Sequence, residues 1–358
     1  MEKKRNHMLD VMKGICIIFI VITHFDWTDA DRLKFGFPFW IDMAVPLFMI
    51  ISGYAYSMSF QNHKIERFSE AFRLNDVLMK FIRYTVPFCI ALLIEFAAIA
   101  IGSVVMPDVF SGWLPQGILS VFKITVTGGL GPGSYYYPIM VQFIFTFPII
   151  YFIVKRYNTF GFILCILINV LYEIVQTGYG LNEETYRLLL FRYVMLIAFG
   201  VYFYLNKGRK FNPAFTIAFL FIGISYIVAN KYLGWQPKSI PYWQGTSYLA
   251  AMFIIPIVNI LLKKDFKFKP IELLGRASFE IFLTQMVYYT FGASLINKII
   301  ESDLIRFTIS IVANLIFGTI FYLVEDPITR KVAKAVGAKV NELNVDGIES
   351  KLDAVAFK

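Results

Sequence analysis

Apolar runs of about 20 residues recur along almost the whole chain, and a run of that length is what a helix needs to cross a bilayer. With 58% hydrophobic and 16% charged residues, the 358-residue chain is too apolar for a soluble domain. We therefore predict an all-α fold, a polytopic transmembrane bundle of about ten spans. The predicted spans are 9–26, 39–60, 80–105, 135–154, 159–177, 187–206, 212–231, 245–263, 274–296 and 303–324.

Basic residues fall mainly in alternate loops. One set of loops, together with the two chain ends, holds 24 of the 34 Lys and Arg residues, whereas the opposite loops hold 8. Because cytoplasmic loops carry the excess of Lys and Arg, this imbalance predicts that both termini are cytoplasmic. The same alternation accounts for the net charge of +9 and argues against a nucleic-acid partner. The first span has a basic flank but no small-residue cleavage site, which indicates a retained helix.

We predict two parts, a transmembrane domain over residues 1–326 and a polar, amphipathic tail over 327–358 on the inner surface. The loop 107–134 is rich in Gly and Pro, and its stretch 114–127 is too short to span, which favours a re-entrant or interfacial segment. No internal repeat is evident, and this weakens an inverted-repeat transporter. Cys16, Cys89 and Cys165 lie in apolar runs without metal-ligand spacing, so we interpret them as buried hydrophobic residues and predict no metal site.

The first span carries a histidine, His24, near its far end and a lysine, Lys13, near its start. An ionisable side chain inside a bilayer is costly and is a functional candidate by default. Eleven residues make about three helical turns, or roughly 16 Å, so the two side chains share one face at opposite levels of the membrane. An imidazole can take a proton from an acceptor hydroxyl at working pH, so His24 is our candidate general base. The alternatives are an interfacial packing histidine and a snorkelling, positive-inside lysine.

A second group of cations opens the third span. Lys80 and Arg83 are three residues apart and therefore lie on one helix face, and Pro87 is expected to kink the helix above them. Together with Lys13 they would form a cytoplasmic socket for phosphates, which Arg binds bidentately and Lys binds as a point charge. Ordinary positive-inside charge is the other interpretation.

Two carboxylates are candidates for orienting or polarising His24. Asp42 opens the second span at a level comparable with that of His24, and Glu95 lies in the outer half of the third span. Arg192, inside the sixth span, needs an anion, which either carboxylate could supply. Tyr135, Tyr136 and Tyr137 follow flexible glycines and could stack on a sugar ring, although an aromatic interface belt explains them equally well.

Several segments match a known pattern in order and at compatible spacing. They are Leu9-Asp10, Lys13-Gly14 and His24 in the first span; 45–54 (VPLFMIISGY) in the second; Arg83 and Pro87 in the third; and 275–285 (GRASFEIFLTQ) late in the chain. Over nearly the whole chain they resemble the acyltransferase-3 family of integral membrane acyltransferases. The family usually has Arg at position 13 and His at position 285, so Lys13 is a departure that keeps its charge, and we assign Gln285 no catalytic role.

The resemblance implies an acyltransferase, an enzyme that moves an acyl group, usually acetyl, from cytoplasmic acyl-CoA to a hydroxyl on the outer face. Acetyl-CoA would be a donor substrate rather than a bound cofactor, with its phosphates at Lys13, Lys80 and Arg83 and its thioester near His24. The acceptors implied are surface glycans or lipid-linked sugars, and the location is the cytoplasmic membrane of a bacterium. Membrane lipids are the other expected partners, and a homo-oligomer stays open.

Two other functions remain compatible with the sequence. One is a transporter or flippase of a lipid-linked glycan or small anion, in which the same charges line the pathway. The other is a catalytically silent assembly partner, which the departures at Lys13 and Gln285 permit.

Overall fold

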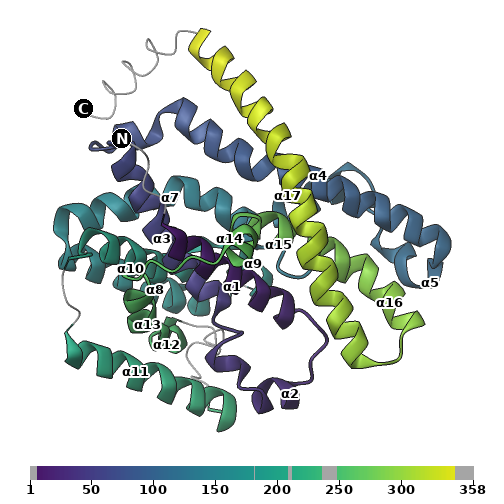
Figure 1. Ribbon diagram of the computed structural model, residues 1–358, viewed down its shortest axis with the longest axis horizontal. Coiled ribbons are helices and arrows are strands. Elements are labelled where there is room, and N and C mark those ends of the chain that lie inside the picture. The colour runs from purple at the N-terminus through teal and green to yellow at the C-terminus, as the bar shows by residue number, and fades with distance from the viewer. Residues whose placement is uncertain (1–5, 181, 209–211, 236–247, 343–358) are drawn as a thin grey trace.

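The structure, a computed structural model, describes residues 6–180, 182–208, 212–235 and 248–342. Within these ranges the chain folds into helices and no strand occurs, which confirms the all-α prediction (Figure 1). The first half contains α1 (His7–Thr23), α2 (Asp29–Lys34), α3 (Ala44–Asn62), α4 (Leu74–Val105), α5 (Pro107–Phe110), α6 (Ile118–Thr127), α7 (Tyr136–Tyr157) and α8 (Thr159–Tyr179).

The second half contains α9 (Glu183–Leu188), α10 (Val194–Leu205), α11 (Pro213–Ile227), α12 (Tyr248–Ala251), α13 (Ile254–Leu261), α14 (Lys269–Arg276), α15 (Ser278–Val287), α16 (Ala293–Ile299) and α17 (Asp303–Glu342). Short 3-10 helices lie at η1 (Phe37–Phe39), η2 (Ser69–Phe72), η3 (Ser111–Trp113) and η4 (Leu190–Tyr193). Two π-helical turns, η5 (Val228–Tyr232) and η6 (Tyr288–Gly292), extend α11 and α15.

Each of the ten predicted spans overlaps one or more of these helices. Among the described residues, 6 helical segments are long and apolar enough to cross a membrane. They are Phe37–Asn62, Leu74–Val105, Tyr136–Tyr157, Thr159–Gln176, Pro213–Tyr232 and Asp303–Val340. The predicted spans 9–26, 187–206, 245–263 and 274–296 are instead made of shorter helices, such as the 17-residue α1 and the pieces α14 to α16. The first three residues of 245–263 lie outside the described ranges.

Two further predictions concern the segment 107–134 and the boundary between the transmembrane domain and the tail. The segment 107–127 forms two short helices bent by 90°, the geometry of a broken span or a re-entrant loop. The predicted boundary after residue 326 falls inside α17, which continues through Pro327 as one helix, and residues 343–358 lie outside the described part. Of the cysteines, Cys16 and Cys165 are buried as predicted, whereas Cys89 is exposed on α4.

Helix α1 crosses the middle of the molecule and packs between α3 on one side and α14 and α15 on the other (Figure 1). Glycines set two of the closest helix contacts. A Cβ added to Gly14 would overlap the carbonyl group of Ile271 on α14, and one added to Gly275 would overlap that of Asp10 on α1. Small residues allow membrane helices to approach this closely, so the backbones of α1 and α14 touch.

A second glycine contact joins α3 to α10. Gly53 faces the Ile197 carbonyl, and Gly200 faces the Ile50 carbonyl, each without room for a Cβ. Nearly every side chain of α10 is buried, so α10 lies at the centre of the helix packing. By contrast, α11 and α17 lie at the edge of the bundle and expose apolar side chains, as helices in contact with lipid do (Figure 1).

Candidate functional site

His24 closes α1 as its C-cap residue. The helix begins after Asn6, whose side chain accepts a hydrogen bond from the backbone N–H of Leu9. At the other end, Nδ1 of His24 lies 2.8 Å from the carbonyl oxygen of Ile20. A carbonyl oxygen can only accept, so in the neutral imidazole Nδ1 carries the proton and Nε2 keeps a lone pair. The helix end thus fixes the tautomer that a general base needs.

Gln285 is the second polar partner of the ring. Its amide nitrogen lies 3.2 Å from Nδ1 of His24, and the side chain is fully buried on α15. Because Nδ1 donates to Ile20, a hydrogen bond with Gln285 requires the amide to be turned so that Oε1, which is buried and has no partner among the described residues, faces Nδ1–H. Nearby, the Tyr289 hydroxyl donates to the carbonyl oxygen of Val21 at 2.8 Å and holds the end of α1. Sequence reasoning gave Gln285 no role, yet an amide in an apolar span, at the position where the related family has His, was a signal that could have found it.

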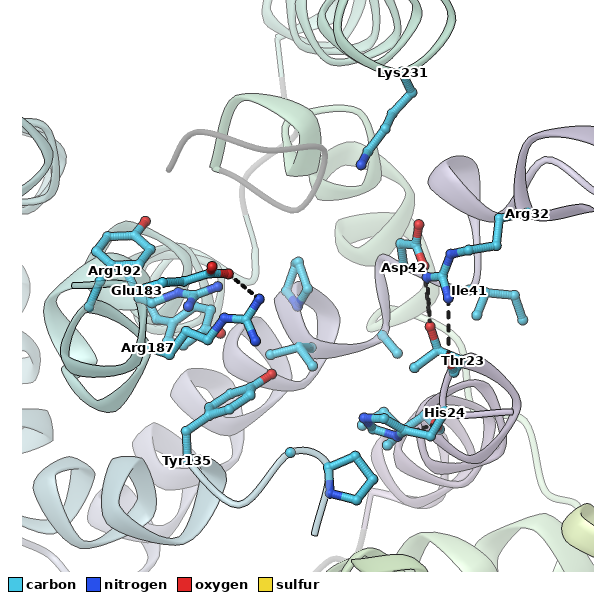
Figure 2. A pocket seen from close by; sticks show the side chains of 18 residues that line it. Thr23, His24, Arg32, Ile41, Asp42, Tyr135, Glu183, Arg187, Arg192 and Lys231 are labelled. Atoms are coloured by element: carbon cyan, nitrogen blue, oxygen red, sulfur yellow. Dashed lines mark hydrogen bonds and ion pairs between the residues drawn. The ribbon is translucent and has the colours of Figure 1, made fainter. Parts of the chain in front are cut away.

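The His24 cavity, as we call the pocket that this ring lines, has a volume of about 410 Å³ (Figure 2). Beside His24, Asp42 accepts hydrogen bonds from Arg32 at 2.5 Å and from the Thr23 hydroxyl at 3.3 Å. Figure 2 shows this group on the same side of the cavity as the imidazole. The carboxylate that we predicted to orient or polarise His24 thus lines the same cavity, and its hydrogen-bond partners among the described residues are Arg32 and Thr23.

The opposite wall of the cavity carries Tyr135, Arg187 and Arg192 (Figure 2). Arg187 forms an ion pair with Glu183, one helical turn away on α9. The guanidinium of Arg192 instead lies 4.7 Å, 5.0 Å and 6.0 Å from the ring centroids of Tyr193, Tyr186 and Tyr135. The expectation that Asp42 or Glu95 pairs with Arg192 is thus not met by any ion pair among the described residues.

Glu95 also differs from its predicted role at the imidazole. The carboxylate is 2% exposed and accepts hydrogen bonds from the backbone N–H of Leu130 at 3.2 Å and the Thr290 hydroxyl at 3.5 Å. It therefore holds the glycine-rich loop 128–133 rather than His24. That loop forms part of the cavity wall, since a Cβ on Gly133 would lie 3.6 Å from Cε1 of His24. The backbone of Gly133 has φ of +85°, a conformation that other residues rarely adopt.

The three consecutive tyrosines point in different directions, because neighbouring residues on a helix do not share a face. Tyr135 lines the His24 cavity. Tyr137 is buried against α4, where its ring stacks on Phe88 with centroids 3.7 Å apart. Tyr136 lines a different cavity and packs against Phe282, with centroids 4.9 Å apart. A single sugar ring stacked on all three is therefore incompatible with the structure.

The Lys13 cavity, at the other end of α1, has a volume of about 620 Å³. Lys13, Lys80 and Arg83 all line it, as the predicted socket requires. Lys80 lies 5.0 Å from the ring centroid of Phe60, whereas Arg83 is exposed to the cavity. Two buried carboxylates, Glu280 and Glu325, also line it and lie within electrostatic range of Arg83. The charges of this cavity are therefore mixed, with several cations around a buried acidic pair.

A short chain of contacts separates the two cavities. Gly133 lies between His24 and Phe282, and Phe282 packs on Tyr136, which borders the Lys13 cavity. The arrangement gives two polar cavities on one helix, with an aromatic partition between them. The Lys13 cavity contains Lys13, Lys80 and Arg83, and the His24 cavity contains an imidazole whose Nε2 makes no hydrogen bond with another described residue.

Comparison with known proteins gave one result at the level of the family. A family model described as an acyltransferase domain matches residues 6–323 of the 358-residue chain. No curated protein and no solved structure matched the chain.

Proposed function

Since the chain belongs to the acyltransferase-3 family and folds into the apolar helices of a multi-pass membrane acyltransferase, we propose that it transfers an acetyl group from acetyl-CoA to the hydroxyl of a glycan. One observation carries the proposal. The Lys13 cavity and the His24 cavity lie at opposite ends of α1, so the cations for a donor and the base for an acceptor are held by one helix.

The Lys13 cavity suits the phosphate end of CoA. Arg83 can contact a phosphate through two N–H groups, and Lys13 and Lys80 add positive charge. From Lys13 to His24 the helix rises roughly 16 Å, a distance that the pantetheine arm of CoA would cross. In the orientation predicted by the Lys and Arg distribution, the donor would enter from the cytoplasm and the acceptor from outside.

We propose that His24 acts as the general base. Its Nε2 accepts the proton of the acceptor hydroxyl while the hydroxyl oxygen attacks the thioester carbonyl carbon. The C–S bond then breaks, the ester forms, and the CoA thiolate takes the proton back from the imidazolium. The products are an O-acetylated acceptor and CoA thiol. The hydrogen bond from Nδ1–H to Ile20 supports this assignment because it leaves Nε2 unprotonated.

The test is CoA thiol release from acetyl-CoA by the purified protein in nanodiscs, with a surface-glycan extract as acceptor. We expect His24→Ala to lower kcat by about 10² to 10⁴-fold, the usual contribution of a general base. The matched control is His63→Ala, because His63 also caps a helix and also places Nδ1 2.8 Å from the carbonyl four residues earlier, yet it is exposed.

If the His24→Ala protein transferred the acetyl group at the full rate, His24 would not be the general base. Acetyl-CoA binding without turnover on any extract would favour a silent assembly partner. Absence of both binding and turnover would favour a transporter, in which the charged side chains line a pathway.

A further inference from the structure

The charges of the His24 cavity do not cancel. Four cations line it, and they are Arg32, Arg187, Arg192 and Lys231. The two carboxylates that line it are Asp42 and Glu183. Each carboxylate is already used, since Arg32 pairs with Asp42 and Arg187 pairs with Glu183. Among the residues that the structure describes, Arg192 and Lys231 are therefore left without an ion-pair partner.

The surroundings of Arg192 indicate that its positive charge favours an anionic ligand. Its guanidinium is only partly accessible and lies among the rings of Tyr135, Tyr186 and Tyr193. Glu173, a buried carboxylate within electrostatic range of Arg192, accepts a hydrogen bond from the Tyr186 hydroxyl at 2.8 Å, and no ion pair joins it to Arg192 among the described residues. A half-buried cation of this kind is costly unless an anion reaches it, because aromatic rings compensate only part of the lost hydration.

Lys231 reaches the same space from another element. It lies in the π-helical turn η5, and Figure 2 shows its side chain pointing down into the cavity from above, toward the space between Arg192 and His24. Two cations from separate elements thus line one cavity that His24 also borders. Such an arrangement binds a phosphate or carboxylate, since Arg offers a planar pair of donors and Lys a mobile charge.

The neighbouring pocket on the other side of His24 has the opposite balance. Its charged lining residues, besides the histidine, are Asp26, Asp303 and Arg306, and Arg306 pairs with Asp303. An anionic ligand would therefore enter on the side of Arg192 and Lys231, where the field is positive.

We propose that Arg192 and Lys231 form an anion-binding subsite, and that the acceptor is a glycan whose reacting hydroxyl lies close to a phosphate or carboxylate group. This inference rests on the proposed function, because it takes the His24 cavity as the acceptor site. It adds the chemical class of acceptor, since a neutral sugar would leave both cations unsatisfied.

The test measures binding and transfer separately. Thermal stabilisation of the full-length protein in phosphatidylcholine nanodiscs is measured with glucose 1-phosphate, glucuronate and glucose. We expect the two anions to stabilise the protein and glucose to have no effect. Arg192→Gln should weaken anion binding by about 10- to 100-fold, the range for loss of a charge-assisted hydrogen bond. Lys231→Gln should weaken it less, and Arg192→Lys should restore part of it. The matched control is Arg156→Gln, which removes an exposed charge at the end of α7.

Transfer is then measured as CoA thiol release with the glycan extract split by anion exchange into neutral and anionic fractions. Only the anionic fraction should support release. If anions bind in a way that depends on Arg192 but no transfer occurs, the anion-binding subsite is supported and the proposed acyltransferase activity is contradicted. If the neutral fraction supports transfer, and Arg192→Gln does not change the rate of that transfer, the proposed acyltransferase activity is supported and the subsite is contradicted.

Two further outcomes would overturn the proposal. Equal stabilisation by glucose, or no stabilisation by either anion, would mean that the surplus charge does not select the ligand. If nanodiscs of phosphatidylglycerol abolished the effect of glucose 1-phosphate, the subsite would belong to a lipid headgroup instead of the acceptor.

Discussion

The two cavities at the ends of α1 differ in how their charges are balanced. In the His24 cavity both carboxylates form ion pairs, and Arg192 and Lys231 have no ion-pair partner among the described residues. In the Lys13 cavity the buried carboxylates Glu280 and Glu325 lie close to each other and to Arg83. The first cavity therefore has a fixed positive surplus, whereas the second has cations that share their field with an acidic pair.

This difference separates recognition from chemistry. In the proposed reaction, the surplus charge at Arg192 and Lys231 selects the acceptor, and the reacting atoms lie at His24. At the other end, Lys13, Lys80 and Arg83 line the cavity proposed for the donor, and Lys13 is separated from His24 by a helix rise of roughly 16 Å. Substitutions in the Lys13 cavity should therefore change the KM for acetyl-CoA, and substitutions around His24 should change kcat.

After His24→Ala, the largest effect expected from this comparison is that of Lys13→Ala. Removal of the ammonium should raise the KM for acetyl-CoA by about 10- to 100-fold, since a hydrogen bond to a charged group contributes ~1.5–3 kcal/mol. Initial rates at varied acetyl-CoA measure this change. Lys13→Arg keeps the charge and should keep the KM, and Lys155→Ala, which removes an exposed lysine at the end of α7, serves as the control. An unchanged KM for Lys13→Ala would mean that the two ends of α1 are not divided in this way.

A smaller effect is expected at Glu95, a positioning residue for the loop 128–133. Glu95→Ala leaves the Leu130 N–H without its acceptor, and the loop that borders His24 should shift. We expect kcat to fall about tenfold while the KM for acetyl-CoA changes little, because an unsatisfied buried donor costs ~1–3 kcal/mol. Glu95→Gln retains an acceptor oxygen and should recover most of the rate. A rise in the acetyl-CoA KM with kcat intact would contradict this role.

The smallest effect is expected at Gln285. Gln285→Leu removes the amide beside Nδ1 of His24 but leaves the hydrogen bond to Ile20, so the ring is less tightly oriented. A neutral hydrogen bond contributes ~1 kcal/mol, which corresponds to about a fivefold loss of kcat. Steady-state kinetics with Gln285→Asn and Gln285→His as companions measure it. Equal rates for all four proteins would show that Ile20 alone orients the ring.

Much of this architecture could be predicted from composition and pattern. The apolar runs identified helical segments, and each predicted span overlaps a helix. The spacing of Lys80 and Arg83, together with Lys13, predicted side chains that do share one cavity. Periodicity is a local property, so it holds for single helices and for side chains on one helix face. The number of spans is less accessible, because α14 to α16 and α12 to α13 are short pieces whose apolar run is continuous in sequence.

The partners of the charged side chains could not be predicted. The positions of Asp42 and Glu95 in their predicted spans put them near the level of His24 in the membrane. Position along a helix does not determine which neighbour a side chain faces. The partner of Glu95 is a backbone N–H in a glycine-rich loop, and that of Asp42 is Arg32 from the segment just before it. Backbone donors have no signature in the sequence. Arg192 was expected to pair with Asp42 or Glu95, and its guanidinium lies instead among the rings of Tyr135, Tyr186 and Tyr193.

The glycine contacts that join α1 to α14 and α3 to α10 have a mechanical consequence. Backbones in direct contact at Gly14 and Gly275 cannot slide past each other without a clash, so α1 is fixed lengthwise in its frame. A transporter needs such sliding or rocking, whereas a group-transfer site does not. The other end of α1 is held by the hydrogen bond from the Tyr289 hydroxyl to the Val21 carbonyl oxygen. In the proposed reaction, α1 therefore keeps a constant interval of roughly 16 Å between Lys13 and His24. The pantetheine arm of CoA is long enough to span that interval. A truncated donor such as S-acetyl-N-acetylcysteamine would place its thioester near His24 but would have no phosphate to bind in the Lys13 cavity.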